Sequence, residues 1–131
     1  MSDRIQNFTP NSTYEVVGAF RENDGEKVVG IEGRIFVADG VTIRAVLKRE
    51  GSKDELQYYG NIREKGIDLN LLGNSELEHY SLQLKRKQRG DLWVGTRNNE
   101  RAFMILEHEG SMTGERNLLY KKGLDYLSED K

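Results

Sequence analysis

The 131-residue chain has no cysteine, one proline and no long hydrophobic run. Without cysteine it can form neither a disulfide bond nor a thiolate-ligated metal site. No apolar stretch approaches the roughly 20 residues that a helix needs to cross a bilayer, so we expect no membrane association. The first residues contain no apolar segment of the kind found in secretory signals, which favours a cytoplasmic protein by default. A mature exported form would show the same N-terminus.

A strong charge of one sign is also missing. Charged residues make up 32% of the chain, yet the formal net charge is only −2. This balance argues against a protein dedicated to nucleic acid, because such proteins carry a clustered positive charge. We therefore predict no nucleic-acid partner.

Residues that carry catalysis are scarce. The two histidines, His79 and His108, lie far apart in the sequence, and a metal site needs three or four ligands. The glycines occur singly, so the sequence contains no phosphate-binding loop. We predict no cofactor, no metal and no catalytic residue, with His79 on a connection and His108 at the end of a strand.

The clearest structural signal is the stretch from Val28 to Glu50, VVGIEGRIFVADGVTIRAVLKRE. Two β-branched runs flank Ala38-Asp39-Gly40, which predicts a β-hairpin. A three-residue loop there would pair Ile35 with Ile43 and make one face wholly apolar, whereas a two-residue loop would set apolar residues opposite charges. Because burial fixes register, we predict the three-residue loop. The other face then carries Glu32, Arg34, Arg44 and Lys48, with Phe36 and Val46 as apolar exceptions.

Alternating apolar and polar residues predict further strands on both sides of this hairpin. Turn-forming residues separate them at short intervals, so neighbouring strands should pair as an antiparallel up-and-down meander. The first two strands should pair Phe20 with Val29 and Val16 with Gly33. The predicted strands begin at Thr13 and continue as Val28–Val37, Val41–Glu50, Glu55–Ile62, Ile67–Leu71, Tyr80–Leu84, Asp91–Arg97 and Glu100–His108.

The pattern changes at the C-terminal end of the chain. Tyr120, Leu124 and Leu127 recur at spacings of four and three residues, which predicts one or two helical turns. We expect residues 111–131 to pack on the last hairpin, Asp91–His108, on the face that carries Trp93, or on a neighbouring subunit. Residues 1–12 are predicted to form a flexible arm, and residues 13–110 the β domain.

Together these elements predict a single-domain all-β fold. A flat sheet would leave its apolar face in water and expose two edges, and closure solves both problems. We predict a closed or nearly closed antiparallel β-barrel of about eight strands, with a sandwich as the alternative. In strand count and turn length over Thr13–His108, the arrangement is similar in outline to the calycin-like lipocalin, fatty-acid-binding and avidin group. That outline implies a barrel able to enclose a small ligand, although the lipocalin Gly-x-Trp motif near the first strand is absent.

The face predicted to point inward offers a candidate ligand site. Tyr14, Tyr58, Tyr80 and Phe103 would place a few hydroxyl groups in an otherwise apolar cup. Such a cup suits a small apolar or amphipathic ligand. The alternative is that the tyrosines fill the core and hydrogen-bond to the backbone of turns.

The last hairpin is apolar on both faces, so both faces should be covered. Trp93, Met104 and Leu106 on its outward face, with Leu118 from the tail, would suit a protein interface or a dimer contact. Trp and Met are enriched at such interfaces. The alternative is burial of this face under the tail of the same chain.

The favoured function is non-catalytic binding. The chain would be a protein-interaction module of the inhibitor, immunity or assembly type, with another protein or a second copy as partner. The alternative is a barrel that encloses a small apolar or amphipathic ligand. A third hypothesis is an enzyme that shapes an apolar cavity around a reactive substrate. A tyrosine or His79 would then supply the only polar group that assists the reaction.

Overall fold

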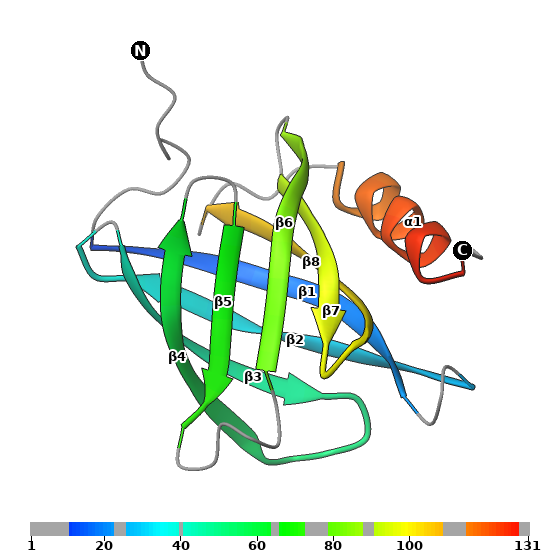
Figure 1. The fold of residues 1–131 in the computed structure, drawn as a ribbon, viewed down its shortest axis with the longest axis horizontal. Helices are drawn as coiled ribbons and strands as arrows, with labels where there is room; N and C mark the ends of the chain where they lie inside the picture. Colours follow the sequence, from blue (N-terminus) through cyan, green and yellow to red (C-terminus); the bar gives the residue numbers. More distant parts are fainter. Residues whose placement is uncertain are drawn as a thin grey trace.

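A computed structural model describes residues 11–22, 26–39, 41–63, 66–72, 79–87, 91–108 and 115–128. These residues form eight antiparallel strands closed into a barrel, followed by one helix (Figure 1). The predicted all-β barrel with a C-terminal helix is confirmed. Residues 1–10 of the predicted arm and 109–114 before the helix lie outside the described residues. The elements are β1 (Ser12–Glu22), β2 (Lys27–Val37), β3 (Thr42–Arg49), β4 (Glu55–Arg63), β5 (Gly66–Leu71), β6 (His79–Lys87), β7 (Asp91–Arg97), β8 (Glu100–His108) and α1 (Glu115–Ser128).

Closure of the sheet decides which side of each strand faces the interior. Each strand pairs with the next one in the chain, and β8 returns to pair with β1. The β1–β2 register is the predicted one, with Phe20 opposite Val29 and Val16 opposite Gly33. No described strand is left with an unpaired edge, so the barrel offers no edge to which a partner strand could be added.

The β2–β3 hairpin is present, but its predicted register was wrong by two residues. Ile35 pairs with Ala45 instead of Ile43. A shift of two keeps the same side chains inward, so the predicted faces of these two strands are confirmed. The observed register also sets Arg34 opposite Val46, which avoids the like-charge pair that the predicted register would create.

The Asp39 side chain stabilises this shifted connection. Its Oδ1 accepts hydrogen bonds from Val41 N at 3.1 Å and from Thr42 N at 2.9 Å. These two backbone donors hold the pKa of Asp39 below its ordinary value. Ala38 N then donates to Thr42 O at 3.0 Å, so the loop closes one residue further along on each strand than predicted.

Glycines at four inward positions mark where neighbouring strands approach most closely. At each position an added β-carbon would collide with the backbone of the adjacent strand, so only glycine fits. Glycines of this kind permit the strong bending that closes a small barrel. Close backbone contact between neighbouring strands therefore explains these four glycines. The collisions would be Gly18 with Phe103 O, Gly33 with Val46 O, Gly60 with Asp68 O and Gly95 with Ser81 O.

The buried side chains form two clusters. The first fills the barrel and includes aromatic side chains from several strands. The second lies between the outside of the barrel wall and α1. The main aromatic members of the first cluster are Tyr14, Phe20, Tyr58, Tyr80 and Trp93. The buried members of the second cluster are Ala19, Leu92, Phe103, Ile105, Leu119 and Leu127.

The predicted faces of the last hairpin were the wrong way round. Its two-residue loop is correct, since Asn98 and Asn99 have φ values of 52° and 74°, as a type I′ turn requires. However, Trp93 faces the barrel interior and Phe103 faces the helix. Alternation could not choose between two apolar faces. The pairing of β1 with β8 decides which face points inward, because it sets Met104 opposite Gly18, an inward position of β1.

The helix is longer than predicted, with 14 residues, and it covers the outer side of β1, β7 and β8 (Figure 1). Its last turn has no basic side chain of its own to meet the free carbonyls. The barrel supplies two. Arg21 donates to Leu127 O at 2.6 Å, and Arg101 donates to Tyr126 O at 2.8 Å. These bonds anchor the end of the helix to the barrel wall.

Candidate functional site

The three tyrosines predicted to line a ligand cavity belong to the packed core. Tyr14, Tyr58 and Tyr80 are buried inside the barrel. The rings of Tyr58 and Tyr80 meet edge to face, with centroids 5.7 Å apart and an interplanar angle of 73°, as in a filled aromatic core. Phe103 is not with them. It lies under α1, where its ring centroid is 5.2 Å from that of Tyr120, so the structure does not bring the four candidates together.

Three of the four residues predicted to form an interface are buried. Trp93, Met104 and Leu106 lie inside the barrel, and Trp93 is 0% exposed. Leu118 on α1 is different, because 49% of its surface is exposed. In this fold a partner cannot touch the first three side chains, so an interface has to use other residues.

A row of aromatic and polar side chains crosses the outer face of five neighbouring strands. Because paired residues point to the same side of a sheet, and adjacent strands lie about 4.8 Å apart, these side chains form a continuous line. We call them the outer row. Cross-strand pairs join Phe36 to Arg44, Arg44 to Tyr59, Tyr59 to Asn70 and Asn70 to His79, from β2 to β6.

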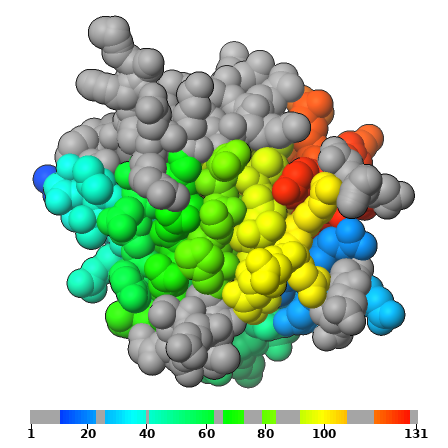
Figure 2. Space-filling view, in the orientation of Figure 1, coloured from blue at the N-terminus to red at the C-terminus, as the bar shows by residue number. Residues whose placement is uncertain are grey.

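A groove of about 790 Å³ opens over the first part of the outer row. Its large apolar side chains are exposed: Phe36 by 43%, Tyr59 by 43% and Leu72 by 53%. Such a gathering of exposed apolar side chains makes the groove a candidate binding surface. In Figure 2 the cyan side chains of the β2–β3 region border the green side chains of β4 and β5 on the left of the view. The outward side chains of this outer groove are Phe36, Thr42, Arg44, Val46, Gln57, Tyr59, Asn61 and Leu72.

Among the described residues, Arg44 is the only charged side chain that lines the outer groove. It is exposed and lies in register between Phe36 and Tyr59. Within the described part of the chain, its guanidinium has no hydrogen-bond or ion-pair partner. The groove is therefore locally positive although the whole chain carries −2. A guanidinium flanked by aromatic rings suits a carboxylate that has apolar groups on either side.

The far end of the outer row is held by hydrogen bonds. His79 Nδ1 lies 2.6 Å from Asn70 Oδ1, within hydrogen-bonding distance. His79 N donates to Asn98 Oδ1 at 2.9 Å, and Asn98 N donates to His79 O at 3.0 Å. These bonds place His79 at the start of β6 and not on the connection, where it was predicted.

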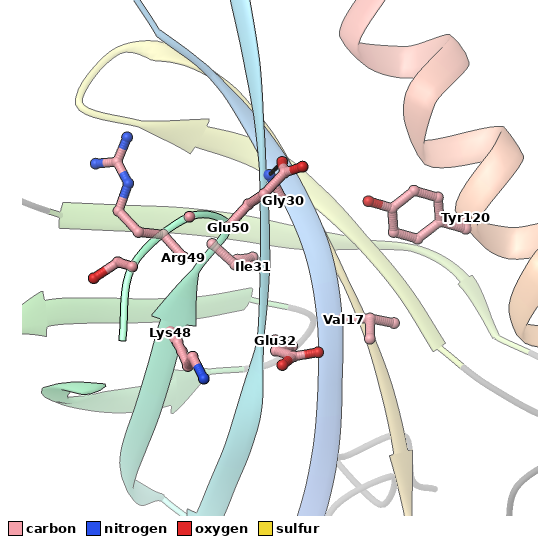
Figure 3. A pocket seen from close by; sticks show the side chains of 10 residues that line it. Val17, Gly30, Ile31, Glu32, Lys48, Arg49, Glu50 and Tyr120 are labelled. Carbon is pink, nitrogen blue, oxygen red and sulfur yellow. Dashed lines mark hydrogen bonds between the residues drawn. The ribbon is translucent and has the colours of Figure 1, made fainter. Parts of the chain in front are cut away.

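A second concavity, of about 400 Å³, lies where the β3–β4 turn meets α1 (Figure 3). We call it the helix cleft. The Glu50 carboxylate accepts a hydrogen bond from Gly30 N at 3.0 Å, and it points toward the Tyr120 phenol. Tyr120 OH donates to Gly18 O at 3.3 Å. These contacts connect the β3–β4 turn and α1 to β1 and β2, so the residues around the helix cleft help to hold the fold together.

Tyr120 makes the stability of these contacts depend on pH in the alkaline range. Burial, and secondly the negative charge of Glu50, raise the pKa of Tyr120 above its ordinary value. The neutral phenol is thus favoured in the folded state, and its contribution to stability is complete below the ordinary tyrosine pKa of about 10. That contribution is lost as the pH rises through the raised pKa, because a phenolate cannot donate to Gly18 O.

We expect Glu50→Gln to lower the pKa of Tyr120 part of the way toward its ordinary value, since burial remains. Asp54→Asn removes an exposed carboxylate that does not line the helix cleft and should leave the pKa unchanged. The measurement is an alkaline titration of phenolate absorbance, taken as each protein minus its Tyr120→Phe counterpart. Equal pKa values in the wild type and in Glu50→Gln would show that the carboxylate does not act on the phenol.

The sequence contained a signal for the outer groove that the prediction did not use. Phe36 and Val46 were apolar exceptions on a face that is otherwise charged. Tyr59 falls on the same side of the barrel by strand alternation. Two apolar exceptions on one strand pair do not by themselves indicate a binding surface. Only the registers of the neighbouring strands show that a third exposed apolar side chain, Tyr59, lies on the same face.

No protein-family model, curated protein or solved structure matches this chain. Across the described ranges, no group of three or more His, Asp or Glu side chains is placed to hold a metal ion. In the same ranges no helix has the length and apolar character to span a membrane. The function therefore has to be argued from the barrel, the outer groove and the helix cleft.

Proposed function

We propose that this protein is a non-catalytic binding module that recognises another protein through the outer groove. The observation that carries the proposal is the exposure of Phe36, Tyr59 and Leu72 around Arg44. Aromatic and arginine side chains supply much of the binding energy at protein interfaces, and exposed apolar clusters mark such interfaces. The composition of the groove is therefore that of an interface core with one charge at its centre.

The outer groove is favoured over a ligand inside the barrel. Tyr58, Tyr80 and Trp93 occupy the interior, each with 3% exposure or less. A ligand in the barrel would have to displace packed side chains, whereas a partner on the outer groove covers apolar surface that is already in water.

Binding is also favoured over catalysis at this site. General acid–base catalysis needs a proton donor and acceptor placed within hydrogen-bond reach of each other or of the substrate. Among the described residues that line the outer groove, none is Asp, Glu, His or Lys. An exposed arginine between aromatic rings orients and holds an anion but is effectively always protonated.

Photo-crosslinking tests the proposal. A benzophenone amino acid is placed at Phe36, at Tyr59 or, for comparison, at the equally exposed Leu118 of α1, and the protein is illuminated in its native host. We expect the two groove positions to form a covalent adduct with the same protein, identified by mass spectrometry, and Leu118 to form none with it. Adducts from Leu118 alone, or different adducts from every position, would contradict a binding surface at the outer groove.

A further inference from the structure

We infer that the partner presents an extended peptide segment in which an aspartate or glutamate lies between bulky apolar residues, and that Arg44 binds this carboxylate. The inference rests on the proposed function and adds the chemistry of the partner. Three observations carry it: the missing edge of the barrel, the charge of the outer groove and the spacing of its rings.

The closed barrel excludes the commonest way in which a sheet binds a peptide. An extended peptide usually adds to an exposed strand edge through main-chain hydrogen bonds. Here every described strand is paired on both sides, so a peptide can be recognised only by side chains on the outer face. The outer row supplies such side chains in a straight sequence, from Phe36 to His79.

The spacing of the outer row fits an extended segment laid across the strands. Phe36 and Tyr59 are two strands apart, or roughly 10 Å, with Arg44 midway between them. An extended chain advances about 3.3 Å per residue and turns every second side chain to the same face. Three alternate residues therefore span about 13 Å, so the outer two side chains can lean onto the two rings while the middle one meets Arg44. The whole row covers four strand spacings, or roughly 19 Å, which is the length of about six extended residues.

The charge of the outer groove sets the charge of the segment. Arg44 is the single charge that the described lining residues present, and no described residue neutralises it. Covering an arginine with a purely apolar partner would leave a desolvated charge unpaired, which is strongly unfavourable. A carboxylate placed between the two rings satisfies the guanidinium with paired hydrogen bonds while the flanking apolar side chains cover Phe36 and Tyr59.

A single-stranded nucleic acid fits this surface less well, although it could stack its bases on the two rings. It brings a phosphate with every nucleotide and needs a track of cations beneath it. The surface that adjoins the outer groove across Phe36 and Val46 mixes both signs instead of continuing the positive charge. Its charged side chains are Glu15, Glu32, Arg34, Lys48 and Glu55.

The test is affinity selection of a phage-displayed library of random dodecapeptides on the immobilised full-length protein. Synthetic copies of the selected peptides are then titrated by fluorescence anisotropy against the wild type and variants. We expect the selected sequences to share an acidic residue flanked by large apolar ones. Arg44→Glu should weaken binding at least about tenfold, whereas Lys53→Glu, the same charge change at an exposed turn position, should leave it unchanged.

A charge swap keeps the test independent of any loss of folding. A selected peptide in which the acidic residue is replaced by lysine should bind Arg44→Glu better than it binds the wild type. Selected peptides without an acidic residue, or peptides that bind Arg44→Glu as tightly as the wild type, would overturn the inference about the partner and leave the groove itself standing. So would selection of no peptide, or tighter binding of a single-stranded oligonucleotide than of any peptide. Binding that Phe36→Ser and Tyr59→Ser do not weaken would instead count against the groove and thus against the proposed function.

Discussion

Replacing Gly33 by valine is expected to unfold the barrel. A β-carbon at Gly33 would lie on the carbonyl oxygen of Val46 and 3.0 Å from Leu47 Cα, so the obstacle is the backbone of β3 and not a side chain that could rotate away. The two strands would have to separate, which breaks hydrogen bonds of their ladder. Overpacking against side chains costs about 1–3 kcal/mol. We expect a larger loss here, approaching the total stability of about 5–15 kcal/mol of a typical domain.

Gly66→Val is the matched control for this substitution. Gly66 is half-buried, as Gly33 is, and lies at the start of a strand, but a β-carbon there would meet only Leu82 O at 3.7 Å. We expect its free energy of unfolding to stay within about 1 kcal/mol of the wild type. Urea unfolding followed by circular dichroism measures both variants. If Gly33→Val were as stable as Gly66→Val, the strands would not approach as closely as the structure places them.

The packed core also bears on where the protein binds. The interior of the barrel is filled by buried side chains, among them Tyr58, Tyr80 and Trp93, and has little space to offer a ligand. The large apolar residues that the core does not use are then exposed on the outer face. Phe36 and Tyr59 are in this position, on either side of Arg44. Because the interior is filled, the outer face carries the candidate site.

Short turns and clean alternation made much of the fold predictable. The β1–β2 pairing of Phe20 with Val29 and the β3–β4 pairing of Leu47 with Leu56 follow from large residues facing apolar partners on one side. A barrel was predictable because a long apolar face with two open edges has few stable arrangements. Local pattern was sufficient wherever one face of a strand is polar.

The errors arose where the alternation of apolar and polar residues does not decide how the strands pair. Nothing in alternation shows that the Asp39 carboxylate would bond two backbone N–H groups and move the β2–β3 register by two residues. In the last hairpin both faces are apolar, and the choice between Trp93 and Phe103 as the inward residue depends on how β8 meets β1. That ladder joins the two ends of the β domain, so it becomes visible only once the barrel is closed.

The outer row was beyond sequence reasoning for a related reason. Its members come from five strands, and each must be placed in register with the next before the row exists. The predicted register of β2 with β3 would have put Phe36 opposite Thr42 instead of Arg44. An error of two residues in one hairpin was therefore enough to separate the central arginine from one of its two rings.

Gly123→Val is expected to lift the helix from the barrel. A β-carbon at Gly123 would lie against the ring of Phe103, which is fully buried and also packs edge to face on Tyr120. Valine forms helix slightly better than glycine, by a few tenths of a kcal/mol, so propensity alone favours the variant. The collision outweighs this gain, and we expect the free energy of unfolding to fall by about 1–3 kcal/mol. Lys121→Val changes an exposed position of the same helix and should have a much smaller effect.

A second substitution and two probes show whether the loss arises at this contact. Phe103→Ala removes the ring, so the double variant with Gly123→Val should be less destabilised than the sum of the two single variants. Additive effects would place the helix away from Phe103. Displacement of the helix should also uncover the apolar wall of β8 and increase the binding of a fluorescent hydrophobic dye. Trp93 points into the barrel, so its emission should remain that of a buried indole, and a red shift on displacement would instead put Trp93 beneath the helix.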